Sequence, residues 1–288
     1  MRLDGRREST NVDDRRGMSG GRKAGFAGIG GIIIVAIITL LTGGDLSSLV
    51  QQAQQMSGSG TSESYQPTAE EEELATFCKQ ILASTEDVWT QEFHKIGKTY
   101  KSPTLVLFTG SVSTGCGNGS ASTGPFYCSA DQCLYIDLSF FEQMKSWRKS
   151  KGDMDFAYAY VIAHEVGHHV QYLLGTLSAA HQKMARLSQT EANKVSVRIE
   201  LQADFYAGVW GYYEGKLYNS LEDGDLEEAL NCAQDIGDDY LQKQAYGTTQ
   251  PETFNHGTSA QRLRWLRLGL TTGDMTLGDT FSKSDAQL

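Results

Sequence analysis

Hydrophobic and polar positions divide this chain of 288 residues into segments of different kinds. Residues 24–41, AGFAGIGGIIIVAIITLL, contain no charge and reach the roughly 17–25 residues that a bilayer-spanning helix needs. Residues 42–72 are rich in Gly, Ser, Gln and Glu, so we expect a flexible tether there. Residues 73–288 carry the pattern of a folded domain.

Within that domain the spacing of apolar residues predicts both helices and strands. An amphipathic helix is expected over 71–97, and two short β-rich runs, TLVLFTG and QCLYIDLSFF, are typical of strands. A long helix is expected over 153–175, begun by Asp153 and ended by Gly175, and a second over 193–215, begun by Asn193. Further helices are expected over 225–245 and 259–270. The fold class is therefore α+β, mostly helical with a small sheet.

The apolar segment 24–41 predicts a membrane anchor. Basic residues precede it, and the positive-inside rule then places residues 1–23 in the cytoplasm and the domain in the periplasm or otherwise outside the cytoplasm. A cleaved signal peptide would have a shorter apolar region and a small-residue cleavage site, which TGGDLSSLVQQ lacks. A buried core helix would need a polar face, which GIGGIII lacks. We therefore expect an uncleaved transmembrane helix in a single-pass membrane protein.

Charge and cysteines narrow the class of protein. Residues 1–23 carry seven basic and four acidic side chains, a net charge of +3. The whole chain has a net charge of −10, so residues 24–288 carry −10 − 3 = −13. Such an acidic domain excludes nucleic acid as a partner, because phosphate binding needs a basic surface. None of the five cysteines forms a C-x-x-C pair, and Cys116 and Cys128 flank a Gly- and Ser-rich loop that a disulfide would close. A second pair, Cys78 with Cys232, stays open.

The sequence HEVGH at residues 164–168 carries the candidate chemistry. On a helix, His164 and His168 lie four apart and project from one face, so both can reach a single metal ion. Glu165 is rotated by about 100° from His164, beside the metal, where a base would take a proton from zinc-bound water. The competing interpretation is a buried helix with hydrogen-bonded histidines. His169 points away from the pair and is expected to be structural or to lie at a rim.

A third ligand is expected from a second helix. Glu200 and Asp204 are also four apart, so Glu200 can complete the metal site while Asp204 accepts a hydrogen bond from a ligating histidine. The alternative is a solvated acidic stripe, but the neighbouring residues are apolar, and carboxylates in such surroundings have a partner. His256 is a candidate donor to an oxyanion, with a surface-loop histidine as the alternative. Arg262 fits either a site role or a surface charge.

Together these motifs resemble the bacterial neutral zinc metallopeptidases, membrane-anchored proteins with an H-E-x-x-H motif and a downstream glutamate ligand. The resemblance covers nearly the whole chain and rests on these segments: STNVDDRRG (9–17), GPFYC (124–128), YIDLSFF (135–141), HEVGHHVQ (164–171), ELQAD (200–204) and HGTSAQR (256–262). It implies a zincin-like domain, Zn²⁺ held by His164, His168 and Glu200, Glu165 as the base, and a role for His256. It also implies that YIDLSFF is a strand beside the cleft, to which an extended substrate could add. Cys133 departs from the family pattern and is expected to be a spare thiol.

The function that follows is a membrane-anchored zinc metallopeptidase that acts on a peptide or protein substrate. In it, Glu165 assists the attack of zinc-bound water on the peptide bond. The main alternative is a catalytically silent envelope protein that retains a structural zinc for binding or assembly. Metal-dependent hydrolysis of a non-peptide bond is a third possibility.

Overall fold

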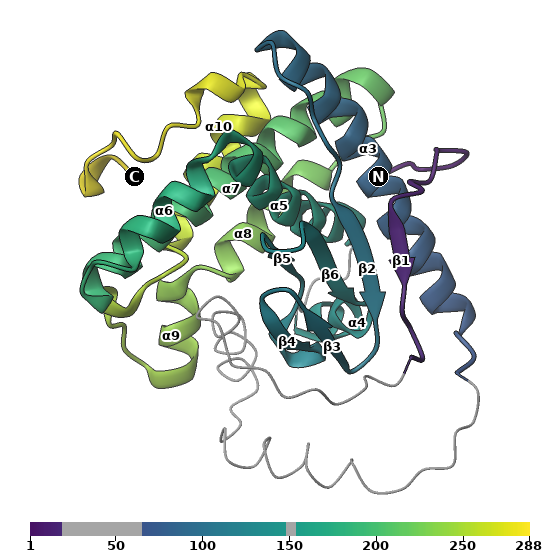
Figure 1. Ribbon diagram of the computed structural model, residues 1–288, viewed down its shortest axis with the longest axis horizontal. Helices are drawn as coiled ribbons and strands as arrows, with labels where there is room; N and C mark the ends of the chain where they lie inside the picture. The colour runs from purple at the N-terminus through teal and green to yellow at the C-terminus, as the bar shows by residue number, and fades with distance from the viewer. Residues whose placement is uncertain (19–64, 148–153) are drawn as a thin grey trace, which may run out of the picture.

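A computed structural model describes residues 1–18, 65–147 and 154–288. The predicted anchor, residues 24–41, lies outside these ranges. Among the described helices, none has the length and apolar character needed to cross a membrane. The predicted fold class is confirmed, because helices form most of the body and a small sheet lies beside them (Figure 1).

The main sheet has four strands in the order β1-β2-β6-β5. The bounds of its strands are β1 (Val12–Asp14), β2 (Thr104–Phe108), β5 (Phe126–Cys128) and β6 (Cys133–Asp137). β1 and β6 run parallel to β2, and β5 runs antiparallel to β6. β3 (Ser111–Thr114) and β4 (Gly117–Ser120) form a separate hairpin on either side of Cys116, and β4 lies in the cysteine-flanked loop. Two of these strands, β2 and β6, match the two predicted runs.

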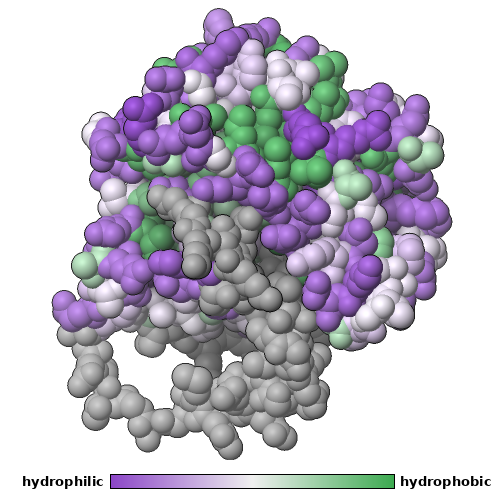
Figure 2. Space-filling model, turned by 180° about the vertical axis from the view of Figure 1, so that it is seen from behind, coloured by the Kyte–Doolittle hydropathy of each residue, from purple (hydrophilic) through white to green (hydrophobic). Residues whose placement is uncertain are grey.

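Helices pack around this sheet and around one another (Figure 1). Their bounds are α3 (Ala69–Lys95), α4 (Ser139–Trp147), α5 (Asp155–Leu174), α6 (Thr176–Met184), α7 (Gln189–Tyr218), α8 (Asp225–Asp235), α9 (Asp238–Tyr246) and α10 (Ser259–Thr272). The short 3-10 helices are η2 (Ala121–Thr123), η3 (Pro251–Thr253), η4 (Met275–Leu277) and η5 (Asp285–Gln287). α5 and α7 cross in the centre of the body, and α10 packs along α7. Seen from behind, the described surface is mainly hydrophilic, with an apolar area in its upper half (Figure 2).

Helix ends correct two predicted boundaries. α7 begins at Gln189, four residues before the predicted cap Asn193, because the Ser188 hydroxyl accepts a hydrogen bond from the Glu191 amide. The N-cap of α5 is Met154, and the predicted cap Asp153 lies outside the described residues. Gly175 ends α5 in the left-handed conformation at φ 85°, as predicted, because glycine adopts it without steric cost. A further helix, α6 (Thr176–Met184), follows Gly175 and was not predicted.

The N-terminal residues belong to the same folded unit as the domain. β1 pairs with β2 in register Val12 to Leu105, and Arg6 forms an ion pair of 2.8 Å with the fully buried Glu214. Two of the basic residues used to predict topology, Arg15 and Arg16, pair with Asp13 and Asp14. Residues 1–18 thus contact the folded domain, while the domain boundary at residue 23 stays a prediction. These residues must lie on the same side of any membrane as β2 while β1 stays in the sheet.

The segments on either side of residues 19–64 also meet. Tyr65 packs directly against Gly17, where a Cβ atom would lie 2.3 Å from the Tyr65 Cβ. Gly17 has φ 73°, so both space and backbone conformation require glycine there. The end of the predicted tether, residues 69–72, forms the first turn of α3, begun by a capping box between Thr68 and Glu71.

The predicted disulfide is present. Cys116, at the turn between β3 and β4, is joined to Cys128 at the end of β5. Cys78, Cys133 and Cys232 are thiols, so the open alternative of a Cys78–Cys232 disulfide does not occur. The predicted strand YIDLSFF is shorter than expected: it contributes Tyr135, Ile136 and Asp137 to β6, of which Tyr135 also pairs with Phe126 of β5, and α4 begins at Ser139. The two edge strands of the sheet are β1 and β5.

Candidate metal centre

Two helices bring the predicted metal ligands together. α5 supplies His164 and His168, and α7 supplies Glu200, whose metal-binding atoms all lie within 4.8 Å of one another. Gly167 allows this approach, because a Cβ atom there would lie 2.8 Å from the backbone oxygen of Ala203 on α7. A larger residue would push the two helices apart. The sequence HEVGH therefore encodes both the ligands and the close packing that joins them to Glu200.

The distances between ligand atoms fit zinc. The Nε2 atom of His164 lies 3.2 Å from one Glu200 oxygen, and that of His168 lies 3.5 Å from the other. Ligands of a tetrahedral zinc, each about 2.0–2.2 Å from the metal, lie about 3.4 Å apart. Two imidazoles and one carboxylate are also a set that catalytic zinc sites use. These three residues could therefore hold one metal ion and leave a coordination position open.

Each histidine is oriented by a partner on its other ring nitrogen. The His164 Nδ1 atom lies 2.8 Å from Asp204, as predicted, and the His168 Nδ1 atom lies 2.9 Å from the side-chain oxygen of Gln171. Both partners turn Nε2 toward the metal position. Burial lowers the pKa of His168 to about 4, which keeps it in the neutral form that binds metal. Burial opposes protonation of His164 as well, but Asp204 and Glu200 raise its pKa overall, so negative charge dominates here.

Asp204 is fully buried and satisfies several donors at once. It accepts hydrogen bonds from the Tyr160 hydroxyl at 2.6 Å and from the Arg262 guanidinium, through two nitrogens, at 2.9 Å each. Burial opposes ionisation, yet Arg262 and His164 lower the pKa of Asp204 to about 2. Of the two interpretations of Arg262, the surface charge is wrong, since this side chain is only 3% exposed. It neutralises the carboxylate that holds His164.

Glu165 lies beside the ligand set, in the place expected for a base. It is buried, and burial raises its pKa to about 7, with Glu200 adding to the effect. The backbone amide of Tyr127, on the edge strand β5, interacts with its carboxylate and favours the charged form. A carboxylate with a pKa near neutrality can both accept and return a proton. The site therefore contains a group suited to proton transfer next to the metal ligands.

His256 is buried and directed by a carboxylate that the sequence did not reveal. Its Nδ1 atom lies 3.0 Å from Asp238 Oδ1, and the other Asp238 oxygen accepts the backbone amides of Asn255, His256 and Gly257. Burial alone would lower the pKa of His256, but Asp238 raises it overall. Its Nε2 atom is buried with no hydrogen-bond partner among the described residues. Glu200 acts electrostatically on this ring, so the free nitrogen belongs to the metal-centre environment.

His169 is structural, in agreement with its expected role. Its Nε2 atom donates to the Lys101 carbonyl at 2.7 Å, and its Nδ1 atom therefore accepts from the Tyr127 hydroxyl at 2.9 Å. The Tyr127 contact fastens β5 to α5, and the Lys101 contact fastens the segment before β2 to α5. Because the Tyr127 amide interacts with Glu165, the fastening also fixes the edge strand relative to the base.

Other residues of the site were missed for different reasons. Tyr160 and Gln171 lie four before His164 and three after His168, so helical spacing could have placed them on the ligand face. Gln202 and Asp238 meet the site through tertiary contacts, for which the sequence has no local signal.

Comparisons with known proteins agree with this geometry. The family model described as "Putative neutral zinc metallopeptidase" matches residues 1–281, nearly the whole chain. The chain belongs to this family. The family implies zinc as the cofactor, and the cluster of His164, His168 and Glu200 could bind it. It also implies a peptide or protein substrate and a hydrolytic activity.

Similar proteins occur in distant bacteria. The chain is 50% identical to the uncharacterized protein YpfJ of Escherichia coli K12, over 99% of this chain and all of the relative. It is 45% identical to the uncharacterized protein Rv2575 of Mycobacterium tuberculosis H37Rv, over 65% of this chain and 64% of the relative. No solved structure shows a significant match. Residues 1–18 fall within the family match, as expected for a segment that completes the sheet.

Proposed function

We propose that this protein is a zinc peptidase in which Glu165 is the general base and His256 stabilises the oxyanion. The observation that carries the proposal is that three buried groups lie close enough to interact electrostatically through Glu200. They are the ligand set, the buried Glu165 carboxylate and the His256 Nε2 atom, which has no partner among the described residues. When bound, zinc supplies Lewis acidity, which acidifies water and polarises the carbonyl of the scissile bond.

The protein residues have distinct tasks in this proposal. Glu165 removes a proton from the attacking water and delivers it to the leaving nitrogen, for which its pKa of about 7 is suited. His256, held by Asp238, directs Nε2–H at the substrate oxygen on which negative charge develops. Arg262 and Tyr160 keep Asp204 fixed, so that His164 does not turn.

The edge strand β5 supports a peptide as the substrate. β5 is paired on one side with β6, and the Tyr127 backbone on its other side meets Glu165. An extended peptide that aligned with β5 would pass the base, because strand addition uses the open backbone groups of an edge. This location replaces the one that the sequence predicted at YIDLSFF.

Membrane anchoring through residues 24–41 and a domain outside the cytoplasm stay predictions. The structure adds one constraint to them: an N-terminus across the membrane from the domain would require β1 to leave the sheet. Cysteine substitutions at two exposed positions, Thr10 in the N-terminal segment and Glu191 on α7, would report sidedness. In a Cys133→Ser background, a membrane-impermeant thiol reagent should label both positions from the same side. Labelling of the two positions from opposite sides of the membrane would mean that β1 is not paired with β2 in the membrane-bound protein.

The decisive experiment compares the full chain with Glu165→Gln and with Glu191→Gln, an exposed control on α7. All three should bind one zinc per chain. Cleavage of a peptide library should fall by about 10²–10⁴-fold in Glu165→Gln, the usual contribution of general base catalysis, and stay unchanged in the control. Tight zinc binding without cleavage by the wild type would instead support the silent envelope protein. Equal cleavage by wild type and Glu165→Gln would remove Glu165 from the mechanism.

A further inference from the structure

The two histidine ligands are oriented by chemically different partners. Asp204, which orients His164, is an ionised carboxylate and can only accept a hydrogen bond. Gln171, which orients His168, carries an amide with an accepting oxygen at one position and a donating nitrogen at the other. A glutamine fixes the histidine only if the amide itself cannot turn over.

The surroundings of Gln171 determine which way its amide points. Its nitrogen donates to the Ile199 carbonyl at 2.7 Å and to the Gln202 side-chain oxygen at 3.1 Å. A carbonyl oxygen cannot donate, so an inverted Gln171 would set oxygen against oxygen. The Gln171 oxygen therefore faces His168 Nδ1, which must carry the proton. The Nε2 atom of His168 is then left with the lone pair that a metal needs.

Gln202 is fixed in the same way, one step further from the metal. Its nitrogen donates to the Gly278 carbonyl at 2.6 Å, so its oxygen must face Gln171. Gln171 is fully buried and Gln202 is 5% exposed, and a buried amide without partners is costly. The Gly278, Gln202, Gln171 and His168 groups thus form a row of hydrogen bonds. The backbone carbonyls of Ile199 on α7 and of Gly278 in the C-terminal segment set the direction of every hydrogen bond in this row.

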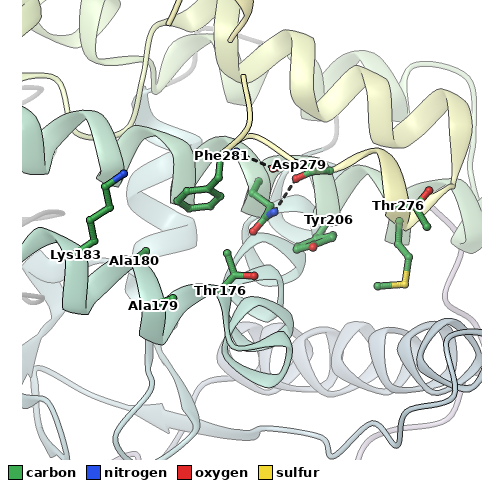
Figure 3. A pocket seen from close by; sticks show the side chains of 11 residues that line it. Thr176, Ala179, Ala180, Lys183, Tyr206, Thr276, Asp279 and Phe281 are labelled. Atoms are coloured by element: carbon green, nitrogen blue, oxygen red, sulfur yellow. Dashed lines mark hydrogen bonds between the residues drawn. The ribbon is translucent and has the colours of Figure 1, made fainter. Parts of the chain in front are cut away.

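The outer end of this row lies at a cavity. Gln202, Tyr206 and Gly278 line a cavity of about 490 Å³ between α6 and the C-terminal segment. Figure 3 shows Thr176, Ala179, Ala180 and Lys183 on one side and Thr276, Asp279 and Phe281 on the other. The C-terminal segment holds none of the three metal ligands, yet its Gly278 carbonyl is where the row ends.

We propose that Gln171 and Gln202 are positioning residues that hold His168 in its Nδ1–H tautomer, ready to bind metal through Nε2. The inference rests on the metal-ligand role of His168 in the proposed function and does not require peptidase activity. Loss of Gln171 removes the direct partner of His168, so the ring can turn or adopt the Nε2–H tautomer. Loss of Gln202 removes one of the two acceptors that orient Gln171 and leaves the Ile199 carbonyl. Its effect on the orientation of His168 is therefore smaller.

The test measures zinc affinity by competition with a chelator for the full chain and four variants. Gln171→Leu should lower the affinity by about 10–100-fold, the usual result of removing such a partner. Gln202→Leu should lower it less. Gln202→Glu should retain more affinity than Gln202→Leu, because a buried glutamic acid in its protonated form keeps an oxygen facing Gln171 and a donor facing the Gly278 carbonyl. Gln189→Leu, an exposed position on α7, should match the wild type.

A second measurement reads the tautomer itself. In chain labelled with ¹⁵N-histidine and freed of zinc, the His168 signals, assigned by their absence in His168→Gln, should show Nδ1–H in the wild type. Gln171→Leu should shift them toward Nε2–H, which a purely structural role for Gln171 would not do.

Wild-type zinc affinity in both Gln171→Leu and Gln202→Leu would overturn the proposal. An unchanged His168 tautomer in Gln171→Leu would overturn it as well. If Gln171→Leu does not fold, the comparison of Gln202→Leu with Gln202→Glu decides instead. A lower zinc affinity in Gln202→Leu than in Gln202→Glu supports the proposal, and equal affinities overturn it. A wild type that binds zinc but cleaves no peptide would end the peptidase proposal without touching this one.

Discussion

The metal centre and the N-terminal segment both bury carboxylates, but they satisfy them differently. At the N-terminal segment, Glu214 receives the Arg6 guanidinium and the hydroxyls of Ser84 and Ser220, so its charge is balanced on the spot. At the metal centre, Asp204 is balanced by Arg262, but Glu200 faces the nitrogens of two histidines. The first arrangement is complete in itself. The second is complete only with a cation among its ligands.

The comparison separates structural from functional burial of charge. Glu86 illustrates the structural kind, because it accepts from Arg7, Ser9 and Asn11 and so fastens the N-terminal segment to α3. At the metal centre, by contrast, ligand atoms converge, and no described residue pairs with the His256 Nε2 atom. We therefore expect changes in the N-terminal segment to alter stability alone. Changes at the metal centre should alter the response to zinc.

The largest expected change in stability comes from Arg6→Ala. This variant leaves the fully buried Glu214 carboxylate without its cation, and breaking such a pair costs about 3 kcal/mol or more. It also removes the contact of the guanidinium with the Tyr218 ring. Urea unfolding of the full chain without zinc measures the loss. The further stabilisation on adding zinc should equal that of the wild type, because none of the ligands is touched.

Arg7→Ala is the matched control for this prediction. Its side chain is half exposed, so water screens its ion pairs with the exposed Asp87 and the mostly buried Glu86, and we expect a smaller loss than in Arg6→Ala. A loss in Arg7→Ala as large as in Arg6→Ala would show that burial of Glu214 is not the cause. A changed zinc response in Arg6→Ala would show that the two regions are coupled.

Gly167→Ala should have the next largest effect, and at the metal centre. The new methyl group would press on the Ala203 backbone of α7, and overpacking of this kind costs about 1–3 kcal/mol. Since α5 and α7 carry the ligands, the added stability from zinc should also fall. Gly215→Ala is the control, because the same change in α7 meets only the flexible Leu221 side chain. Thermal unfolding with and without zinc distinguishes these outcomes.

Helical periodicity made part of the site predictable. His164, His168, Glu200 and Asp204 follow four-residue spacing, which puts each pair on one face of its helix before any tertiary structure is known. The pairing of the two helices depends on apolar neighbours and on Gly167. Asp238 could not be found this way, because it reaches His256 across 18 residues and from the first turn of a different helix.

The strand β1 was missed for a physical reason. β1 has only three residues, two of them acidic, so it carries no strand pattern of its own and forms by adding to β2. Its arginines looked like a membrane-flanking charge, yet Arg15 and Arg16 pair with carboxylates two residues before them in the chain. Local composition cannot distinguish a membrane-flanking segment from an edge strand, because the pairing of β1 with the distant strand β2 decides between them.

The smallest predicted effect concerns the Asp238–His256 pair and depends on pH. The folded pKa of Asp238 lies below its usual 3.8, so its contribution is complete above pH 3.8 and is lost as pH falls through the folded value. The folded pKa of His256 lies above 6.5, so its contribution is complete below pH 6.5 and is lost as pH rises through the folded value. The stability difference between the wild type and Asp238→Asn should therefore be greatest between these two pH values. Urea unfolding at pH 3, 5 and 9, without zinc, tests this, with Asp239→Asn as the neighbouring control. A difference that did not vary with pH would mean that Asp238 acts through its backbone hydrogen bonds rather than through the charge of His256.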